Sequence, residues 1–276
     1  MGFEYVTPAI TRWKLDEFVK VIDEFEEELS DKVHHKMCVK NDYNTILLHI
    51  AGKSLITTRE ILTLCSFGYT DGALSLGRNL YEQMIIVGFF EIHKKDKNFQ
   101  DYIADFFLSY DVQRNKCLRD IEKYVPDSKI EELNEEWQNL KKKAKHAIRR
   151  DYWWTGYNNF SEVVDSVMAD QTDEAIRIFL GIHYMRYKRA CISLHAGCMG
   201  NTIRISGTVG FDEVDTSATL YGQSTPLMYA VTSLIPIVGN ICDAFSMDGT
   251  EYVKELNSLA SWYQEEEKRE TKGSSQ

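Results

Sequence analysis

Apolar residues recur along the chain at the three- and four-residue spacing of α-helices. Trp13, Phe18 and Phe25, for example, share one face of a predicted helix at residues 11–30, whose other face is acidic. The same spacing predicts helices at residues 44–67, 73–93, 96–124, 127–149, 161–168, 173–194 and 250–266. With 4 Pro and 16 Gly in 276 residues, turn residues are too few for a β-sandwich or barrel of many short strands. We therefore expect an all-α bundle of about eight to nine helices.

Two of the predicted helices differ from the others in composition. The helix at residues 73–93 is apolar nearly all round, which is typical of a central helix, yet it carries Arg78 and Glu82. A glycine-bordered turn at residues 68–72 joins it to the preceding helix, so we expect an antiparallel hairpin. The helix at residues 127–149 is rich in Glu and Lys, and we expect it to project into solvent or to pair along a narrow seam.

An uncharged segment covers residues 216–242, and its part from Leu227 to Cys242 is strongly apolar. Pro236 and Gly239 interrupt this part, which is also shorter than the ~20 residues that a bilayer-spanning helix requires. We therefore expect a kinked or two-part helix in the core. A membrane span is the less favoured alternative.

The sequence shows no internal repeat and no domain boundary. We expect residues 1–267 to form a single all-helical domain, with a charged helical excursion at residues 127–150 and a disordered tail at residues 268–276. Six cysteines are scattered without a Cys-x-x-Cys spacing, which is typical of reduced thiols. Residues 1–14 lack the basic start and apolar run of a secretory signal, so we expect a cytoplasmic protein.

The chain carries 32 Lys and Arg against 42 Asp and Glu, and its net charge of −10 excludes a generally basic nucleic-acid-binding surface. The run at residues 141–150, however, holds six positive charges in ten residues and precedes an aromatic segment at residues 152–157. Such side chains can bind phosphates and stack on bases. The candidate substrate-binding residues are Lys142, Lys145, Arg149, Arg150 and Trp154. The alternative is a solvated lysine face with the tryptophans packed in the core.

The well-marked enzyme motifs are absent from the sequence. It has no glycine-rich phosphate loop, no His-Glu-x-x-His helix, no Gly-x-Ser-x-Gly elbow and no cysteine zinc pattern. It also lacks the Glu-x-x-His pairs of carboxylate-bridged metal bundles. We therefore expect neither a metal nor a cofactor.

A ladder of polar residues lies in the predicted helix at residues 173–194 and directly after it. Its members recur every four residues and so share the core-facing side of the helix; they are His183, Tyr187, Cys191 and His195. Buried polar groups need hydrogen-bond partners, and the charged pair of the helix at residues 73–93 is the obvious one. The ladder forms either a functional pocket or a structural network that ties two core helices together.

Three short motifs occur in order along the chain. They are the segment at residues 77–82, the Trp154-Thr155-Gly156 connector, and Tyr187 to Cys191 followed by His195 and Ala196. These motifs resemble a widespread helical family known as domain of unknown function 5677, over about residues 46–200. That family carries Arg-x-x-x-Glu on an early core helix and Tyr-x-x-Leu-Ser-x-x-x-His on a later one. Arg78, Glu82, Tyr187 and His195 match, whereas Ala190 and Cys191 replace the Leu-Ser pair.

That family is in turn similar to the HEPN superfamily of helical nucleotide-binding and RNA-cleaving domains, which implies a HEPN-like core. In HEPN ribonucleases, two Arg-x4–6-His motifs meet at a dimer interface and cleave RNA without metal through the 2′-hydroxyl. Arg189 to His195 fits this spacing, and so does Arg177 to His183, although about one match is expected by chance. Residues six apart on a straight helix differ by ~120°, so Arg189 and His195 converge only if the helix ends before His195 or a second chain contributes.

The resemblance implies a homodimer that acts on RNA or nucleotides, as a metal-independent endoribonuclease toxin or an antiviral effector. His195 would be the acid/base group, and Arg78 or Arg189 would bind phosphate or stabilise the transition state. Glu82 would orient its neighbour, and Tyr187 would supply a hydrogen bond. The alternative is a non-catalytic protein-interaction module with a buried Arg-Glu-His network, whose charged helix contacts a partner protein. A membrane-associated effector that uses residues 227–242 is a third possibility.

Overall fold

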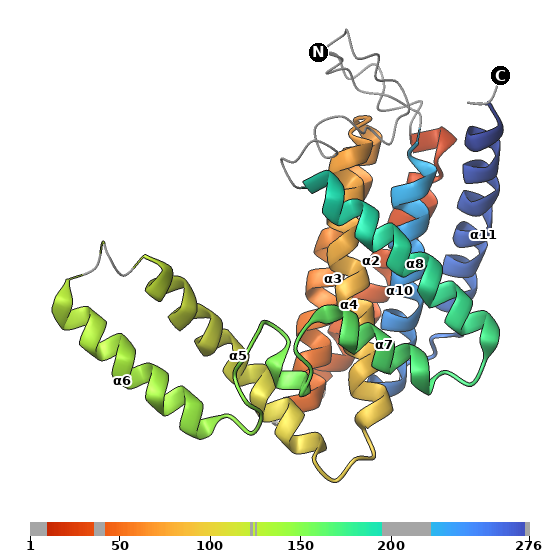
Figure 1. Cartoon of the computed structure of the whole chain (residues 1–276). Helices are drawn as coiled ribbons and strands as arrows, with labels where there is room; N and C mark the ends of the chain where they lie inside the picture. The colour runs from red at the N-terminus through yellow and green to blue at the C-terminus, as the bar shows by residue number, and fades with distance from the viewer. Residues whose placement is uncertain (1–9, 36–41, 122–123, 125, 195–221, 274–276) are drawn as a thin grey trace, which may run out of the picture. The chain divides into compact units, whose positions relative to one another are not determined.

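The computed structural model describes residues 10–35, 42–121, 124, 126–194 and 222–273, and the regular structure in these ranges is helical, without a strand (Figure 1). The helices are α2 (Leu15–His35), α3 (Asp42–Ser66), α4 (Thr70–His93), α5 (Phe99–Asp120), α6 (Asp127–Lys143), the 3-10 helix η3 (Trp153–Thr155), α7 (Phe160–Asp170), α8 (Glu174–Leu194), α10 (Ser224–Phe245) and α11 (Thr250–Gly273). The prediction of an all-α fold is confirmed.

Contacts divide the chain into two compact units. Residues 1–87 and 178–276 form the first unit, and residues 88–177 form the second. Helices α4 and α8 each pass from one unit to the other. The second unit includes the predicted charged excursion at residues 127–150.

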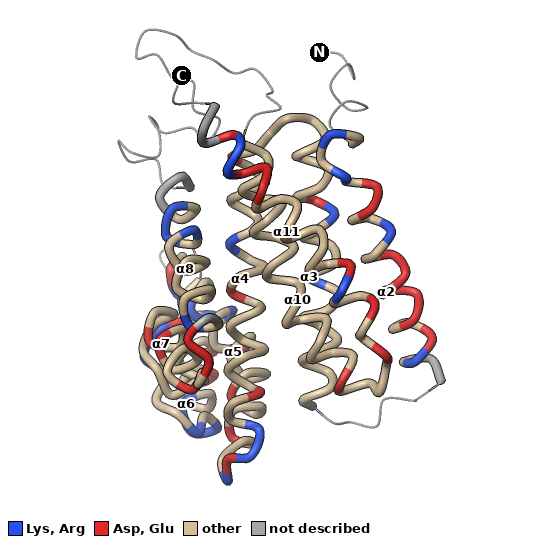
Figure 2. The backbone as a smooth tube through the Cα atoms, turned by 90° about the vertical axis from the view of Figure 1, so that its right-hand side faces the viewer, with Lys and Arg blue, Asp and Glu red and all other residues tan. Residues whose placement is uncertain are grey.

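Helix α10 is the centre of the first unit. It contacts α2, α3 and α11, and α2 also contacts α3 and α11. The apolar residues predicted to share the face of the first helix, Trp13, Phe18 and Phe25, are buried, and acidic residues follow one another along α2 (Figure 2). The Tyr263 hydroxyl of α11 donates a hydrogen bond of 2.7 Å to the Trp13 carbonyl. This bond ties α11 to the turn directly before α2.

The apolar segment around Pro236 packs as a core helix. Every residue from Leu227 to Leu234 is buried. By length and composition α10 could also cross a membrane, but 67% of its most apolar window is buried inside the protein. Helix α10 continues through Pro236, whose carbonyl accepts a hydrogen bond of 2.7 Å from the Asn240 side chain, so the segment is not split in two.

Helices α3 and α4 form the predicted hairpin. Gly68 closes α3 with a φ of 78°, a left-handed conformation that favours glycine. The N–H of Tyr69 donates to the Leu64 carbonyl at 2.8 Å, which satisfies a carbonyl in the last turn of α3. A hydrogen bond between Ser54 of α3 and Gln83 of α4 also joins the two helices away from the turn.

Trp154 lies in the core of the second unit and is only 4% exposed. Its ring stacks on Phe90 at 5.5 Å between centroids and meets Phe89 and Phe106 edge-on at 5.6 and 4.9 Å. Helix α5 packs against η3 and against α6, and α5 and α6 lie side by side as a hairpin (Figure 1). Aromatic packing thus fixes the connector that follows α6.

Helix α6 ends at Lys143, so the prediction that it continues to residue 149 is wrong. The cause is Asp105 of α5, a fully buried residue whose carboxylate accepts the backbone N–H groups of Lys145 and His146 at 2.9 and 2.8 Å. The same carboxylate lies 2.8 Å from Nδ1 of His146. These bonds hold the backbone after α6 in a non-helical path, with Ala144 extended.

Helix α11 continues to Gly273, beyond the predicted end at residue 266. Residues 268–273, expected to belong to a disordered tail, are therefore helical. Glu270 is hydrogen-bonded to the Ser224 hydroxyl and accepts the Gly222 N–H at 2.8 Å. Contacts of Glu270 with the start of α10 hold this last part of the helix. The remaining tail, residues 274–276, lies outside the described ranges.

Candidate functional site

Arg78 and Glu82 form an ion pair one turn apart on α4. Nη2 and Nε of Arg78 lie 3.0 and 3.1 Å from the same oxygen, Oε1 of Glu82. The two side chains are 35% and 20% exposed, so solvent reaches both. The pair is therefore a partly open site rather than a sealed one.

Tyr187 of α8 completes this cluster from below. Its hydroxyl donates to Oε1 of Glu82 at 2.9 Å, and Cζ of Arg78 lies 5.6 Å from its ring centroid. Burial and the nearby Glu82 carboxylate raise the pKa of Tyr187, so the phenol keeps its proton and donates it. Burial would lower the pKa of Arg78, but hydrogen bonding to Tyr187 and the charge of Glu82 raise it overall. The guanidinium therefore stays cationic.

Cys191 belongs to the same cluster. It lies one turn beyond Tyr187 on α8 and is half-buried. Cys191 is the residue at which the resemblance leads one to expect a serine.

Gly77 lets α10 approach α4 directly behind the cluster. A Cβ at residue 77 would lie 2.8 Å from Cδ1 of Tyr229, a distance that real Cβ atoms do not adopt. Tyr229 is fully buried and stacks on Tyr81 of α4 at 5.8 Å and on His183 of α8 at 5.4 Å. This stack joins α4, α8 and α10 and gives the cluster a rigid support.

His183 is buried and takes no part in the ion pair. Nδ1 of its ring lies 3.4 Å from the Thr232 hydroxyl of α10. Burial and the nearby charge of Arg186 lower the pKa of His183 to about 3, so its ring is neutral near pH 7. Of the predicted ladder, Tyr187 meets the charged pair, whereas His183 has a different partner.

Arg189 lies apart from the cluster. It is exposed, whereas Tyr187, two residues earlier, is buried, as expected for positions that differ by ~200° around an α-helix. His195 and the predicted helix stop at residues 196–200 lie outside the described residues. Of the predicted catalytic set, the structure brings together Arg78, Glu82 and Tyr187.

The basic run belongs to the second unit. Lys142 lies in the last turn of α6, and Lys145, Arg149 and Arg150 follow it in the connector; all four are exposed. Trp154 differs, because its ring is buried against Phe90 and offers no face on which a base could stack. Its position is the core packing of the alternative interpretation.

The sequence did not predict a second ion pair, which joins α8 to α11. Arg186 lies 2.7 Å from Glu267 of α11, and Thr225 of α10 donates to the same carboxylate at 3.0 Å. Burial lowers the pKa of Arg186, although Glu267 opposes this effect. The only sequence signal was an arginine beside Tyr187. Within the described ranges, no three His, Cys, Asp or Glu side chains are grouped as metal ligands would be.

Comparison with known proteins finds one family. The sequence model of a family of unknown function (DUF5677) matches residues 44–208, which cover the Arg78–Glu82 pair, the aromatic connector and Tyr187. No curated protein and no solved structure matches the chain significantly.

Proposed function

The chain belongs to the family of unknown function DUF5677, and we propose that it acts on RNA or nucleotides through the cluster of Arg78, Glu82 and Tyr187. The observation that carries this proposal is the guanidinium of Arg78, which is oriented by its neighbours yet 35% exposed. A guanidinium has five N–H donors, and the ion pair with Glu82 engages those on Nε and Nη2. The donors that neither Glu82 nor Tyr187 engages can bind phosphate oxygens.

The reaction in this proposal is the metal-independent cleavage of RNA, in the manner of HEPN domains. The ribose 2′-hydroxyl loses its proton and attacks the adjacent phosphorus, and the 5′-oxygen leaves and gains a proton. His195 exchanges these protons, and Arg78 stabilises the charge that develops on the phosphate. Glu82 and Tyr187 are positioning residues for Arg78. As a toxin or an antiviral effector, the protein would cleave RNA of the cell that contains it by this reaction.

The exposed cations of the basic run would bind the RNA backbone outside the reacting phosphate. Contacts with phosphate are the same for every base, so they do not distinguish one RNA sequence from another. This holds for Lys142, Lys145, Arg149 and Arg150. The burial of Trp154 removes base stacking on that ring from the proposal.

The alternative function is a non-catalytic interaction module. The burial of Tyr187 supports it, because the bond from Tyr187 to Glu82 also braces α8 against α4. The two functions use Arg78 differently. A brace uses it only to stabilise the fold, whereas a phosphate site requires N–H groups of Arg78 that a phosphate can reach.

The deciding experiment measures RNA cleavage in a chelating buffer with Arg78→Gln, His195→Ala and, as a matched control, Arg59→Gln. Arg59 is 37% exposed and bonds two carboxylates, Asp23 and Glu26, so it resembles Arg78 in exposure and pairing. We expect cleavage to fall by about 100-fold or more in the first two variants and to be unchanged in the control.

Thermal unfolding of each variant separates the two functions. If Arg78→Gln lowers the melting temperature and leaves cleavage unchanged, the cluster is a brace and the proposal fails. Equal cleavage by wild type and His195→Ala, or no cleavage of any RNA tried, would also overturn it.

A further inference from the structure

Trp137 of α6 is half-buried and lies beside two cations of the second unit. Cζ of Arg119, from α5, lies 5.3 Å from the centroid of its ring, and Nζ of Lys141, one turn further along α6, lies 5.4 Å from it. The Arg119 guanidinium is also hydrogen-bonded to the Asn134 side chain, which fixes it beside the ring. An aromatic ring with cations around it suits a nucleobase and its phosphates.

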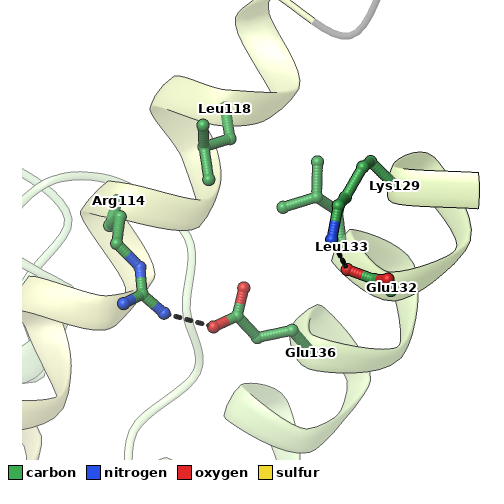
Figure 3. Close-up of a pocket in the computed structure, with 6 residues that line it drawn as sticks. All are labelled: Arg114, Leu118, Lys129, Glu132, Leu133 and Glu136. Atoms are coloured by element: carbon green, nitrogen blue, oxygen red, sulfur yellow. Dashed lines mark hydrogen bonds and ion pairs between the residues drawn. The ribbon is translucent and has the colours of Figure 1, made fainter. Parts of the chain in front are cut away.

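The four glutamates of α6 lie on other sides of the helix. Each is about 100° or more around the helix axis from Trp137, whereas Lys141 is only about 40° from it. Two of them, Glu132 and Glu136, line an open hollow between α5 and α6, and Glu136 pairs there with Arg114 (Figure 3). The glutamates therefore lie apart from the two cations beside Trp137, although α6 as a whole is rich in Glu.

The connector after α6 lies on the side of α5 that carries Arg119. Asp105, Lys116 and Arg119 share a sector of about 60° on this helix and span about 20 Å of it. Asp105 accepts the backbone N–H of Lys145 at 2.9 Å. Nζ of Lys116 lies 4.0 Å from Oδ1 of Asp151. The connector is thus held at two points of this side, and its exposed cations extend the positive surface around the tryptophan ring.

We propose that this surface binds single-stranded RNA and that Trp137 is the ring on which a base stacks. Trp154, which the sequence suggested for this role, is buried, whereas solvent reaches Trp137. The base takes the place of the exposed Lys141 ammonium at the ring, because stacking of a base is stronger than an exposed cation–π contact. Lys141 and the other exposed cations of the basic run then bind the neighbouring phosphates.

The occupant is a single strand because a base in a duplex is already stacked on its neighbours and has no free face for the ring. The choice of RNA rests on the proposed function. The surface itself belongs to the second unit, whereas the Arg78 cluster belongs to the first, so binding and cleavage can be measured separately.

The test is the dissociation constant of the full chain for a single-stranded RNA of about 12 nucleotides. Its 2′-hydroxyls are methylated, so that it binds without being cleaved. We expect Trp137→Leu to raise this constant about tenfold, because leucine keeps a large apolar side chain but offers no ring. Trp137→Phe should raise it less than Trp137→Leu, because phenylalanine keeps a ring.

The matched control is Tyr110→Leu. Tyr110 is an aromatic residue of the same unit that is 73% exposed, and it lies about 180° around α5 from Arg119. This change should leave the dissociation constant unaltered. Circular dichroism should show that all the variants are folded.

The same strand without its bases separates stacking from the attraction of charges. Wild type should bind this abasic strand about tenfold more weakly than the RNA, and Trp137→Leu should bind it as wild type does. A variant that combines Lys141→Gln, Lys142→Gln and Lys143→Gln should bind both strands more weakly, and its affinity should depend less on salt.

Three results would overturn the proposal. They are a wild-type chain that binds no single-stranded RNA, a Trp137→Leu variant that binds it as wild type does, and a loss in Trp137→Leu that is as large with the abasic strand. In the last case Trp137 only holds the cations in place. A chain that binds RNA through Trp137 but cleaves none would contradict the proposed function and leave this inference intact.

Discussion

Gly77 has no side chain, and for that reason the ring of Tyr229 can lie against α4. Gly77 directly precedes Arg78 of the cluster. A single missing methyl group thus sets the distance between two core helices and the support of the cluster. Glycine at this position is a packing requirement, since the helix backbone around it is regular.

Gly77→Ala should therefore destabilise the protein by about 1–3 kcal/mol, because the new Cβ would clash with the buried Tyr229 ring. The matched control is Gly52→Ala in α3, where a Cβ meets no atom within 4 Å. That change should stabilise the protein by up to about 1 kcal/mol, because alanine favours a helix over glycine. Urea unfolding measures both. Equal effects at the two sites would show that the Tyr229 contact does not matter.

The buried ring of His183 should make stability depend on pH. Its pKa is about 3 in the folded chain and 6.5 when exposed, so protons bind the unfolded chain preferentially between these values. The contribution of His183 to the free energy of unfolding is fully present above pH 6.5 and is lost progressively as the pH drops toward 3. From pH 7 to pH 5 the loss due to this residue should be about 2 kcal/mol.

His183→Phe is the control for this loss, because phenylalanine keeps an aromatic ring against Tyr229 but binds no proton. Denaturant unfolding of wild type and variant at both pH values gives the difference. If the two proteins lose the same stability between pH 7 and pH 5, His183 is not the cause.

The sequence predicts part of the cluster because part of it is local. Arg78 and Glu82 are four residues apart on one helix, so periodicity alone pairs them. The partner on α8 could also be inferred, since Tyr187 recurs on its core-facing side. Tyr229 and the pair of Arg186 with Glu267 could not, because no spacing within one helix records which distant residue packs against it.

At the scale of helices, the apolar period finds the elements and misses some of their ends. The period records which face of a helix is buried, and it does not depend on the residues that end the helix. Helix α6 ends early because Asp105, forty residues before, captures the backbone after Lys143. Helix α11 ends late because Glu270 bonds the start of α10. Both contacts join segments far apart in the sequence, so local composition does not contain them.

Asp105→Ala should release the segment after α6. The backbone N–H groups of Lys145 and His146 would lose their shared acceptor, at a cost of about 2–4 kcal/mol, and their hydrogen exchange should become faster. Asp111→Ala on the same helix is the control, because that carboxylate is 45% exposed and pairs with Arg114 at 3.8 Å. It should cost no more than about 0.5 kcal/mol. Unchanged exchange in Asp105→Ala would contradict this role.

At the scale of the whole molecule, the acidity and the apolar helix concern different surfaces. Acidic side chains such as those along α2 contribute to the net charge of −10. Helix α10, whose one charged residue is Asp243, makes its contacts inside the first unit, with α2, α3 and α11. Most of its apolar window is therefore packed inside the protein.

The full chain should accordingly remain in the supernatant when it is centrifuged with vesicles of neutral lipid in the absence of detergent. The reason is that the apolar surface of α10 would have to leave the core before it could enter a bilayer. Vesicles with and without the protein, at low and high salt, provide the comparison. Pelleting with the vesicles at both salt concentrations would support the membrane-associated function instead.

The division into two units also sets the order in which they can fold during synthesis. Residues 88–177 are continuous, so the second unit can fold as soon as it leaves the ribosome. The first unit is built from both ends of the chain, and the bond from Tyr263 to Trp13 joins residues 250 positions apart. Until α10 and α11 are made, the apolar faces of α2 and α3 lack their contacts with these two helices. The nascent chain therefore exposes part of these apolar faces until α10 and α11 have been made, and an exposed apolar face is a site of aggregation.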